Sequence, residues 1–272
     1  MTKNKFFWKV IKTFNELMKN AIKGPDCTDP SICKGDCCDI QTSVPKVLAK
    51  EYIARGYASK EDFIRSNMYS FKLRFDDDTC KCFLFDPLIN GCSIHHSGIK
   101  PPECWIYPTG FSNDGKTEYS CKKKNGWKIK NPKKLQKAEV LFEKYEFLCS
   151  LEAKSEWKKI HQRILYSKKM NLIKELQEFP PSKLAGFQDT WDSIKPLPAE
   201  GYSLQLKNFC KRYNNNCKFL PSNFLKCESI CLKIAKKVIN FLEEYLLAYC
   251  KQVGVDVSGK YPFYKLFEFA KI

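Results

Sequence analysis

The chain has 272 residues, 43% of them hydrophobic, which is enough to bury one large core or two smaller ones. No uninterrupted apolar run approaches the roughly 20 residues of a bilayer-spanning helix, so the sequence predicts no transmembrane segment. A net charge of +17 favours an anionic partner, and fifteen cysteines require either an oxidising compartment or a bound metal.

Residues 1–24 are predicted to form an amphipathic helix. One helical face collects the apolar side chains of Phe7, Val10, Ile11, Phe14, Leu17, Met18 and Ala21. Such a helix either binds a membrane surface or a partner, or packs on the protein's own core. We favour packing on the core.

The same segment lacks the features of a secretory signal. Its apolar stretch FFWKVIKTFNELM is interrupted by Lys9, Lys12 and Glu16, and no cleavage site with small residues follows. We therefore expect a cytoplasmic protein whose thiols stay reduced. In that compartment, clustered cysteines favour a metal over disulfides.

Residues 25–130 are rich in Gly, Pro, Asp and Cys, and short elements are expected there. Residues 44–56 are a predicted helix ended by Gly56. Residues 59–68 are another, with Ser59 as N-cap and Asp62 placed to complete a capping box. The segments SFKLRF and CKCFLF alternate polar and apolar residues around DDDT, which predicts a short β-hairpin or two β-like arms joined by a turn.

Residues 131–272 are predicted to form a helical domain. Apolar stripes begin at Ala138 and Trp157, and the second continues to about residue 179, where two prolines stop it. A looser stretch over 182–201 precedes a final long helix over 223–252. The expected fold class is mainly α, with a loop-rich, metal-stapled cysteine domain containing short β-like arms.

The cysteines of residues 25–130 form an ordered pattern. CTDPSICKGDCC opens it, CFLF and CSIH follow, KPPECWIYP comes next, and CKKKNGW closes it. This order resembles the YkgJ-type cysteine-cluster family of zinc- or iron-chelating domains. The resemblance implies a ligand set of Cys27, Cys33, Cys37, Cys38, Cys82, Cys92, Cys104 and Cys121. Lys100 stands where that family usually has arginine, and Cys80 is an addition to the pattern.

Eight thiols are the number that two four-thiolate sites require, whether these hold tetrahedral zinc or cubane iron–sulfur clusters. Cys37 and Cys38 are adjacent, and in an extended backbone they point to opposite faces, which suits one ligand for each of two sites. A single site with spare thiols is the alternative. Thiolates gathered this closely repel one another unless a cation is bound.

The identity of the metal is left between two candidates. Long loops separate the ligands, in contrast to the compact Cys-x2-Cys knuckles of most structural zinc sites. A 4Fe-4S iron–sulfur cluster is therefore favoured, and zinc is the alternative. In either case the metal also staples a loop-rich domain that has little core of its own.

Other chemically active side chains receive weaker assignments. His95 and His96 are expected at the surface or beside the ligands, because the cysteines already suffice. The aspartates at 76–78 fit a solvated turn. A second concentration of cysteines is explained either as core packing or as a third metal site. It comprises Cys210, Cys217, Cys227, Cys231 and Cys250.

Two functions fit this pattern. The first is a metal-binding protein carrying an iron–sulfur cluster or zinc, extended to an iron–sulfur oxidoreductase or a protein-modifying enzyme. The flagellin lysine N-methylase, which pairs a similar cysteine domain with further sequence, implies that extension by analogy. The second is a metal-stapled, non-catalytic interaction protein whose basic surface binds an acidic protein. Nucleic acid is a candidate partner on charge alone, since the chain has no known nucleic-acid-binding motif.

Overall fold

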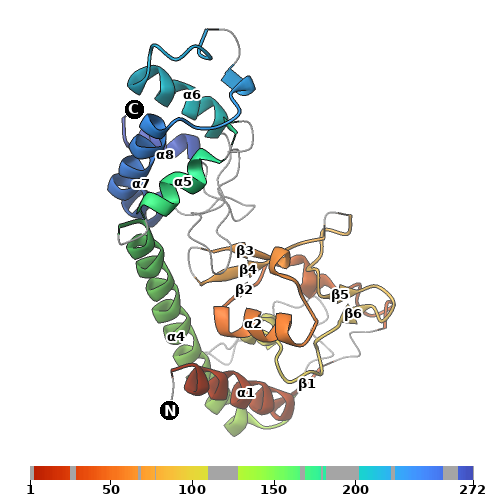
Figure 1. The fold of residues 1–272 in the computed structure, drawn as a ribbon. Helices are drawn as coiled ribbons and strands as arrows, with labels where there is room; N and C mark the ends of the chain where they lie inside the picture. The colour runs from red at the N-terminus through yellow and green to blue at the C-terminus, as the bar shows by residue number, and fades with distance from the viewer. Residues whose placement is uncertain are drawn as a thin grey trace. The chain divides into compact units, whose positions relative to one another are not determined.

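The computed structural model describes residues 3–24, 29–66, 69–76, 78–109, 128–165, 169–178, 180–181, 202–221, 224–253 and 263–271. Over these ranges the fold is mainly helical, as predicted (Figure 1). None of the helices in these ranges is long and apolar enough to cross a membrane.

The chain divides into two compact units. Unit 1 comprises Met1–Ile64 and Met68–Ala153, and unit 2 comprises Arg65–Asn67 and Lys154–Ile272. The division predicted from the sequence, at residues 24 and 130, stays a prediction.

Unit 1 combines helices with short antiparallel strands. The helical elements are α1 (Lys3–Ala21), η1 (Asp36–Asp39), α2 (Lys46–Ala54), η2 (Lys60–Asp62), α3 (Pro102–Thr109) and α4 (Pro132–Leu165), whose last part belongs to unit 2. The strands are β1 (Ile22–Lys23), β2 (Ser43–Val44), β3 (Phe63–Arg65), β4 (Phe71–Leu73), β5 (Phe85–Asp86), β6 (Gly91–Cys92) and β7 (Lys128–Ile129). They pair in the orders β1–β7, β2–β4–β3 and β5–β6.

The first helix packs on the protein's own core, which confirms the favoured interpretation. Phe14, Met18 and Ala21 of α1 are fully buried and share a cluster with Trp105 of α3 and Ala138 of α4. The apolar stripe of α1 is therefore covered within unit 1, where the helix contacts α2 and α3.

The predicted helix over 44–56 is present as α2. It ends before Gly56, whose φ of 75° is the left-handed conformation that glycine adopts at helix C-termini. The N-terminus of α2 is capped by a residue that is remote in the sequence. The Glu152 carboxylate of α4 accepts hydrogen bonds from the Lys46 and Val47 amides. The same carboxylate accepts a hydrogen bond from the Ser70 hydroxyl at 2.8 Å.

The prediction of a helix over 59–68 is wrong beyond the first turn. The capping box of Ser59 and Asp62 is formed, but it closes the short η2. The chain then enters β3, in which Phe63 and Arg65 are buried on alternate positions. Pairing of β3 with β4 outweighs the local helical signal.

The two predicted β-like arms are also found. A β-bridge joins Phe75 to Cys82, and the intervening turn is closed by the Cys80 amide donating to the Asp76 carbonyl at 2.9 Å. Asp77 lies outside the described residues. Cys80 is exposed and has a φ of 54°, which only glycine adopts without strain.

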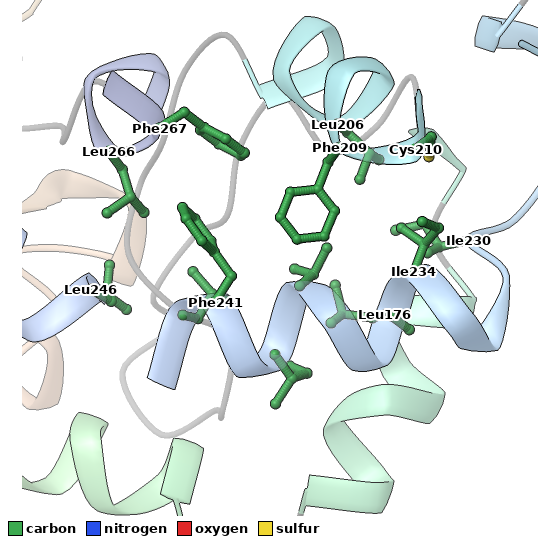
Figure 2. Packing of buried hydrophobic residues seen from close by; sticks show 14 of the residues in the cluster. Leu176, Leu206, Phe209, Cys210, Ile230, Ile234, Phe241, Leu246, Leu266 and Phe267 are labelled. Carbon is green, nitrogen blue, oxygen red and sulfur yellow. The ribbon is translucent and has the colours of Figure 1, made fainter. Parts of the chain in front are cut away.

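Unit 2 is a helical cluster around α7. Its elements are the end of α4, then α5 (Lys169–Gln177), α6 (Tyr202–Tyr213), η5 (Phe224–Lys226), α7 (Leu232–Val253) and α8 (Phe263–Phe269). Figure 2 shows Phe209 of α6 and Phe267 of α8 directed toward Phe241 of α7, with Leu206 beside Phe209. Sequence reasoning did not predict α6 or α8.

The final helix begins later than predicted. The run of 223–252 is interrupted after η5, and α7 starts at Leu232. Ile230 turns into the core before the helix starts, and Cys227 is held by a hydrogen bond from its thiol to the Ser229 carbonyl. The helix α5 ends before Pro180, as expected, and the stretch predicted as loose lies outside the described residues.

Candidate metal centre

Five of the eight predicted ligands come together in unit 1. Cys37 and Cys38 lie in η1, Cys82 lies in the bridge to Phe75, Cys92 ends β6, and Cys104 lies in the first turn of α3. Each of these thiols interacts electrostatically with at least one of the other four. Four separate segments of the chain therefore deliver thiols to one region.

Backbone hydrogen bonds fix these segments to one another. The Cys82 amide donates to the Cys38 carbonyl at 2.8 Å, and the Phe85 amide donates to the Cys82 carbonyl at 2.8 Å. Phe85 in turn pairs with Cys92 across the β5–β6 ladder. The Thr42 hydroxyl lies 3.5 Å from the Cys104 sulfur. Backbone hydrogen bonds thus connect η1 with the segment of Cys82, and strand pairing connects that segment with β6.

Gly35 sets the direction in which η1 begins. It has a φ of 73° and stands at the N-cap, where its carbonyl accepts a hydrogen bond from the Cys38 amide at 2.8 Å. A β-carbon at this position would lie 2.4 Å from Cε2 of the Phe85 ring. Glycine is therefore required both by the backbone conformation and by the close approach of β5.

The vicinal pair differs from the sequence expectation. Cys37 and Cys38 lie in a 3-10 helix rather than in an extended backbone, so the premise that they point to opposite faces is wrong. Their thiols hydrogen-bond to each other, which lowers the pKa of Cys37 and raises that of Cys38. Both members belong to the same cluster of thiols. The number of metal sites stays a prediction.

A buried lysine supplies positive charge to the thiol cluster. The ammonium of Lys100 lies 4.4 Å from the centre of the Trp105 ring, and the residue is 6% exposed. Burial raises the pKa of Cys104 to about 12, and the Lys100 charge acts against that rise. The same charge adds to the Cys38 hydrogen bond in lowering the pKa of Cys37, and it acts against the burial that raises the pKa of Cys92.

The position of Lys100 depends on the first helix. Asn15 of α1 donates from its side chain to the Lys100 carbonyl at 3.0 Å and accepts a hydrogen bond from the Trp105 indole at 2.8 Å. This buried amide ties α1 to both ends of the segment that carries Lys100 and Cys104. Sequence reasoning missed Asn15, whose only signal was a polar residue next to a helix's apolar stripe.

Glu103 is a second group that the sequence did not reveal. Burial raises the pKa of its carboxyl to about 8, although its own backbone amide, Tyr69 and Tyr145 lower it by hydrogen bonding. The Tyr145 hydroxyl lies 3.4 Å from the carboxyl oxygen Oε2. When this carboxyl ionises, its negative charge adds to the rise in the pKa of the Cys104 thiol.

Of the three other predicted ligands, one lies in the described residues. Cys33 is buried and its carbonyl accepts a hydrogen bond from Asn90 at 2.7 Å, but no interaction joins its thiol to the five. Cys27 and Cys121 lie outside the described residues. His95 packs against Trp105 with ring centres 5.7 Å apart, and burial, followed by Lys100 and His96, lowers its pKa to about 4.

The thiol cluster is not a preformed coordination shell. In the ranges that the structure describes, no group of three or more Cys, His, Asp or Glu side chains is already arranged to hold a metal ion. Every described cysteine is a free thiol. What the structure provides is a gathering of soft sulfur donors, half-buried for the most part, around one buried cation.

Comparison with known proteins gives this chain no relative. No family model, no curated protein and no solved structure matches it. The resemblance to cysteine-cluster domains therefore stays a prediction.

Proposed function

We propose that unit 1 is a metal-binding domain that holds its metal on the thiols of Cys37, Cys38, Cys82, Cys92 and Cys104. The observation that carries this proposal is the convergence of these thiols from four segments of the chain. Cysteine packs well as a small apolar residue, but core packing needs no such gathering and would leave each thiol among hydrocarbon neighbours.

The electrostatics of the cluster support a bound cation. Burial raises the pKa of Cys82 and of Cys104 to about 12, and the neighbouring thiolates add to the rise. Lys100 offsets a part of this cost with a single charge. A metal ion bound to several thiolates supplies the remaining positive charge, and binding releases the thiol protons to solvent.

Metal binding requires the sulfur atoms to move closer together than in the described arrangement. The thiols lie in a 3-10 turn, a bridge, a strand end and a first helical turn, and such positions allow side-chain rotation without loss of a long element. We expect metal binding to draw the sulfur atoms together and to stabilise unit 1, because metal affinity at a structural site is also folding free energy.

Iron–sulfur is the favoured occupant and zinc the alternative. The described ligands are spread over separate segments, in keeping with a cluster held by long loops. A 4Fe-4S cluster supplies one-electron transfer, which is compatible with an oxidoreductase or a protein-modifying enzyme. Zinc supplies a tetrahedral crosslink, which is compatible with an interaction protein that binds an acidic partner. We place the protein in the cytoplasm, where free thiols persist.

Metal analysis of the full chain purified without oxygen tests this proposal. We expect bound iron with acid-labile sulfide, or zinc, and loss of most of that metal in Cys104→Ser. The matched control is Cys80→Ser, which removes an exposed thiol of the same unit that lies outside the cluster. Equal metal content in the two variants would contradict the proposal. Visible absorbance of the wild-type chain separates the two occupants, since zinc proteins are colourless.

A further inference from the structure

Unit 2 contains a second gathering of cysteines. Cys210 lies in the last turn of α6, Cys217 in the turn that follows, Cys227 directly after η5, and Cys231 directly before α7. All four belong to the connection between α6 and α7 or to its edges. This connection is long, and a few apolar anchors such as Phe224 and Ile230 attach it to the core.

Asn214 links three of these cysteines. Its amide donates to the Cys210 carbonyl at 2.7 Å, and its own carbonyl accepts from the Cys217 amide at 3.1 Å. Its side-chain nitrogen lies 3.8 Å from the Cys231 sulfur and donates to it. Hydrogen bonds of Asn214 therefore connect the end of α6, the following turn and the residue before α7.

The fourth cysteine joins the same group. Cys227 interacts electrostatically with Cys217 and Cys231, and all three interact with Cys210. Figure 2 shows Cys210 on the side of α6 that faces Ile230 and Ile234, at the end of the core where α7 begins. Four thiols thus lie near one another at one end of unit 2, although no three of these side chains are already arranged to hold a metal ion.

Core packing explains Cys210 but not its three neighbours. Cys210 is 9% exposed, whereas Cys217 and Cys227 are half-buried and Cys231 is exposed. A cysteine that packs as a hydrophobe is usually buried.

We propose that Cys210, Cys217, Cys227 and Cys231 bind one zinc ion that fixes the α6–α7 connection. Cys227 and Cys231 are separated by three residues, which falls within the Cys-x2–4-Cys spacing of structural zinc sites, and four thiolates make the closed tetrahedral shell of such sites. Each thiol releases its proton to solvent on binding, and no electron is transferred.

The structural effect of this zinc site follows from loop closure. An ordered connection of this length loses much conformational entropy on folding, and crosslinks that span it recover a part of that cost. The ion would tie both helix ends to η5, because its ligands come from the end of α6, from the segment after η5 and from the start of α7. All four ligands belong to unit 2, and none of them is a member of the thiol cluster of unit 1.

Zinc analysis of the full chain tests this inference. The chain is produced with zinc under reducing conditions, and zinc per chain is measured in Cys231→Ser and Cys217→Ser. We expect each variant to lose one zinc ion per chain relative to wild type. Cys250→Ser is the control, because Cys250 is a buried thiol of α7 in the same unit, and its zinc content should equal that of wild type.

The same substitutions in a Cys104→Ser background show whether the two sites are independent. The loss of zinc caused by Cys231→Ser should be the same in both backgrounds. When cobalt(II) replaces zinc, the Cys104→Ser protein should show the visible bands of a tetrahedral thiolate site, and the Cys104→Ser, Cys231→Ser protein should lack them. Wild-type zinc content in both Cys231→Ser and Cys217→Ser would overturn the inference. So would a disulfide among the four cysteines, or iron bound in place of zinc.

Discussion

Replacement of Gly35 by alanine is expected to disturb the thiol cluster of unit 1 through two separate effects. The φ of 73° places an alanine in the left-handed region, which costs about 1–2 kcal/mol. The new methyl group would also lie 2.4 Å from the Phe85 ring, so the ring and β5 must shift. Overpacking of this kind costs about 1–3 kcal/mol.

Gly56 provides a matched control for the first effect. It has a φ of 75°, but no heavy atom lies within 4 Å of the position that its β-carbon would take. Gly56→Ala is therefore destabilised by the left-handed backbone conformation alone. The free energy of unfolding of unit 1 should fall about 1–3 kcal/mol further in Gly35→Ala than in Gly56→Ala.

Hydrogen exchange of the slowest amides of unit 1 measures this difference. These should include the Cys82 amide, which is bonded to the Cys38 carbonyl. Since 1.4 kcal/mol is a factor of ten, exchange in Gly35→Ala should be roughly 5- to 150-fold faster than in Gly56→Ala. The double variant Gly35→Ala, Phe85→Leu should recover much of the gap. Equal exchange in the two single variants would refute the close approach of β5 to η1.

Three further predictions concern other parts of unit 1. Glu152→Ala should lower the free energy of unfolding by about 1–2 kcal/mol, because the first amides of α2 lose their acceptor, and Glu152→Gln should lower it less in the same urea titration. Cys80→Gly should raise the thermal midpoint, because it relieves about 1 kcal/mol of left-handed strain, with no change in metal content; a lower midpoint would contradict the assigned turn. Burial raises the pKa of Asp62, but hydrogen bonds from Ser59 and Arg74 outweigh it and leave the pKa lowered. The stability that Asp62→Asn removes should therefore be present above the ordinary carboxyl pKa and vanish as pH falls through the lowered one, as urea unfolding across a pH series would show.

Elements governed by local signals were predicted well from the sequence. The apolar stripe of α1 and the glycine after α2 act within a few residues, and both were read correctly. Elements governed by distant partners were not. The capping box at Ser59 is real, but β3 follows because β4 pairs with it. The acceptor for the first amides of α2 is Glu152, which lies 106 residues beyond Lys46.

The candidate site divides in the same way. The spacing of cysteines indicated which residues to expect together, and five of the eight predicted ligands do converge. The burial and charge of the groups around those thiols could not be predicted from the sequence. The Lys100 carbonyl accepts a hydrogen bond from Asn15 of α1, which is 85 residues away in the sequence, and the elevated pKa of Glu103 arises from its burial. Spacing identifies candidate donors, while tertiary packing sets their charge state.

The contact between Lys100 and Trp105 gives the protein an optical reporter. The indole follows Cys104 in the chain and lies 4.4 Å from the Lys100 charge, which acts against the rise in the pKa of that thiol. Any cation that binds to the thiols changes the electric field at this ring and hence the colour of its emission. Energy transfer to an iron–sulfur cluster would quench the emission, whereas zinc, with its filled d shell, would leave its intensity largely intact. The difference between the wild-type spectrum and that of Trp105→Phe isolates this signal from the other four tryptophans.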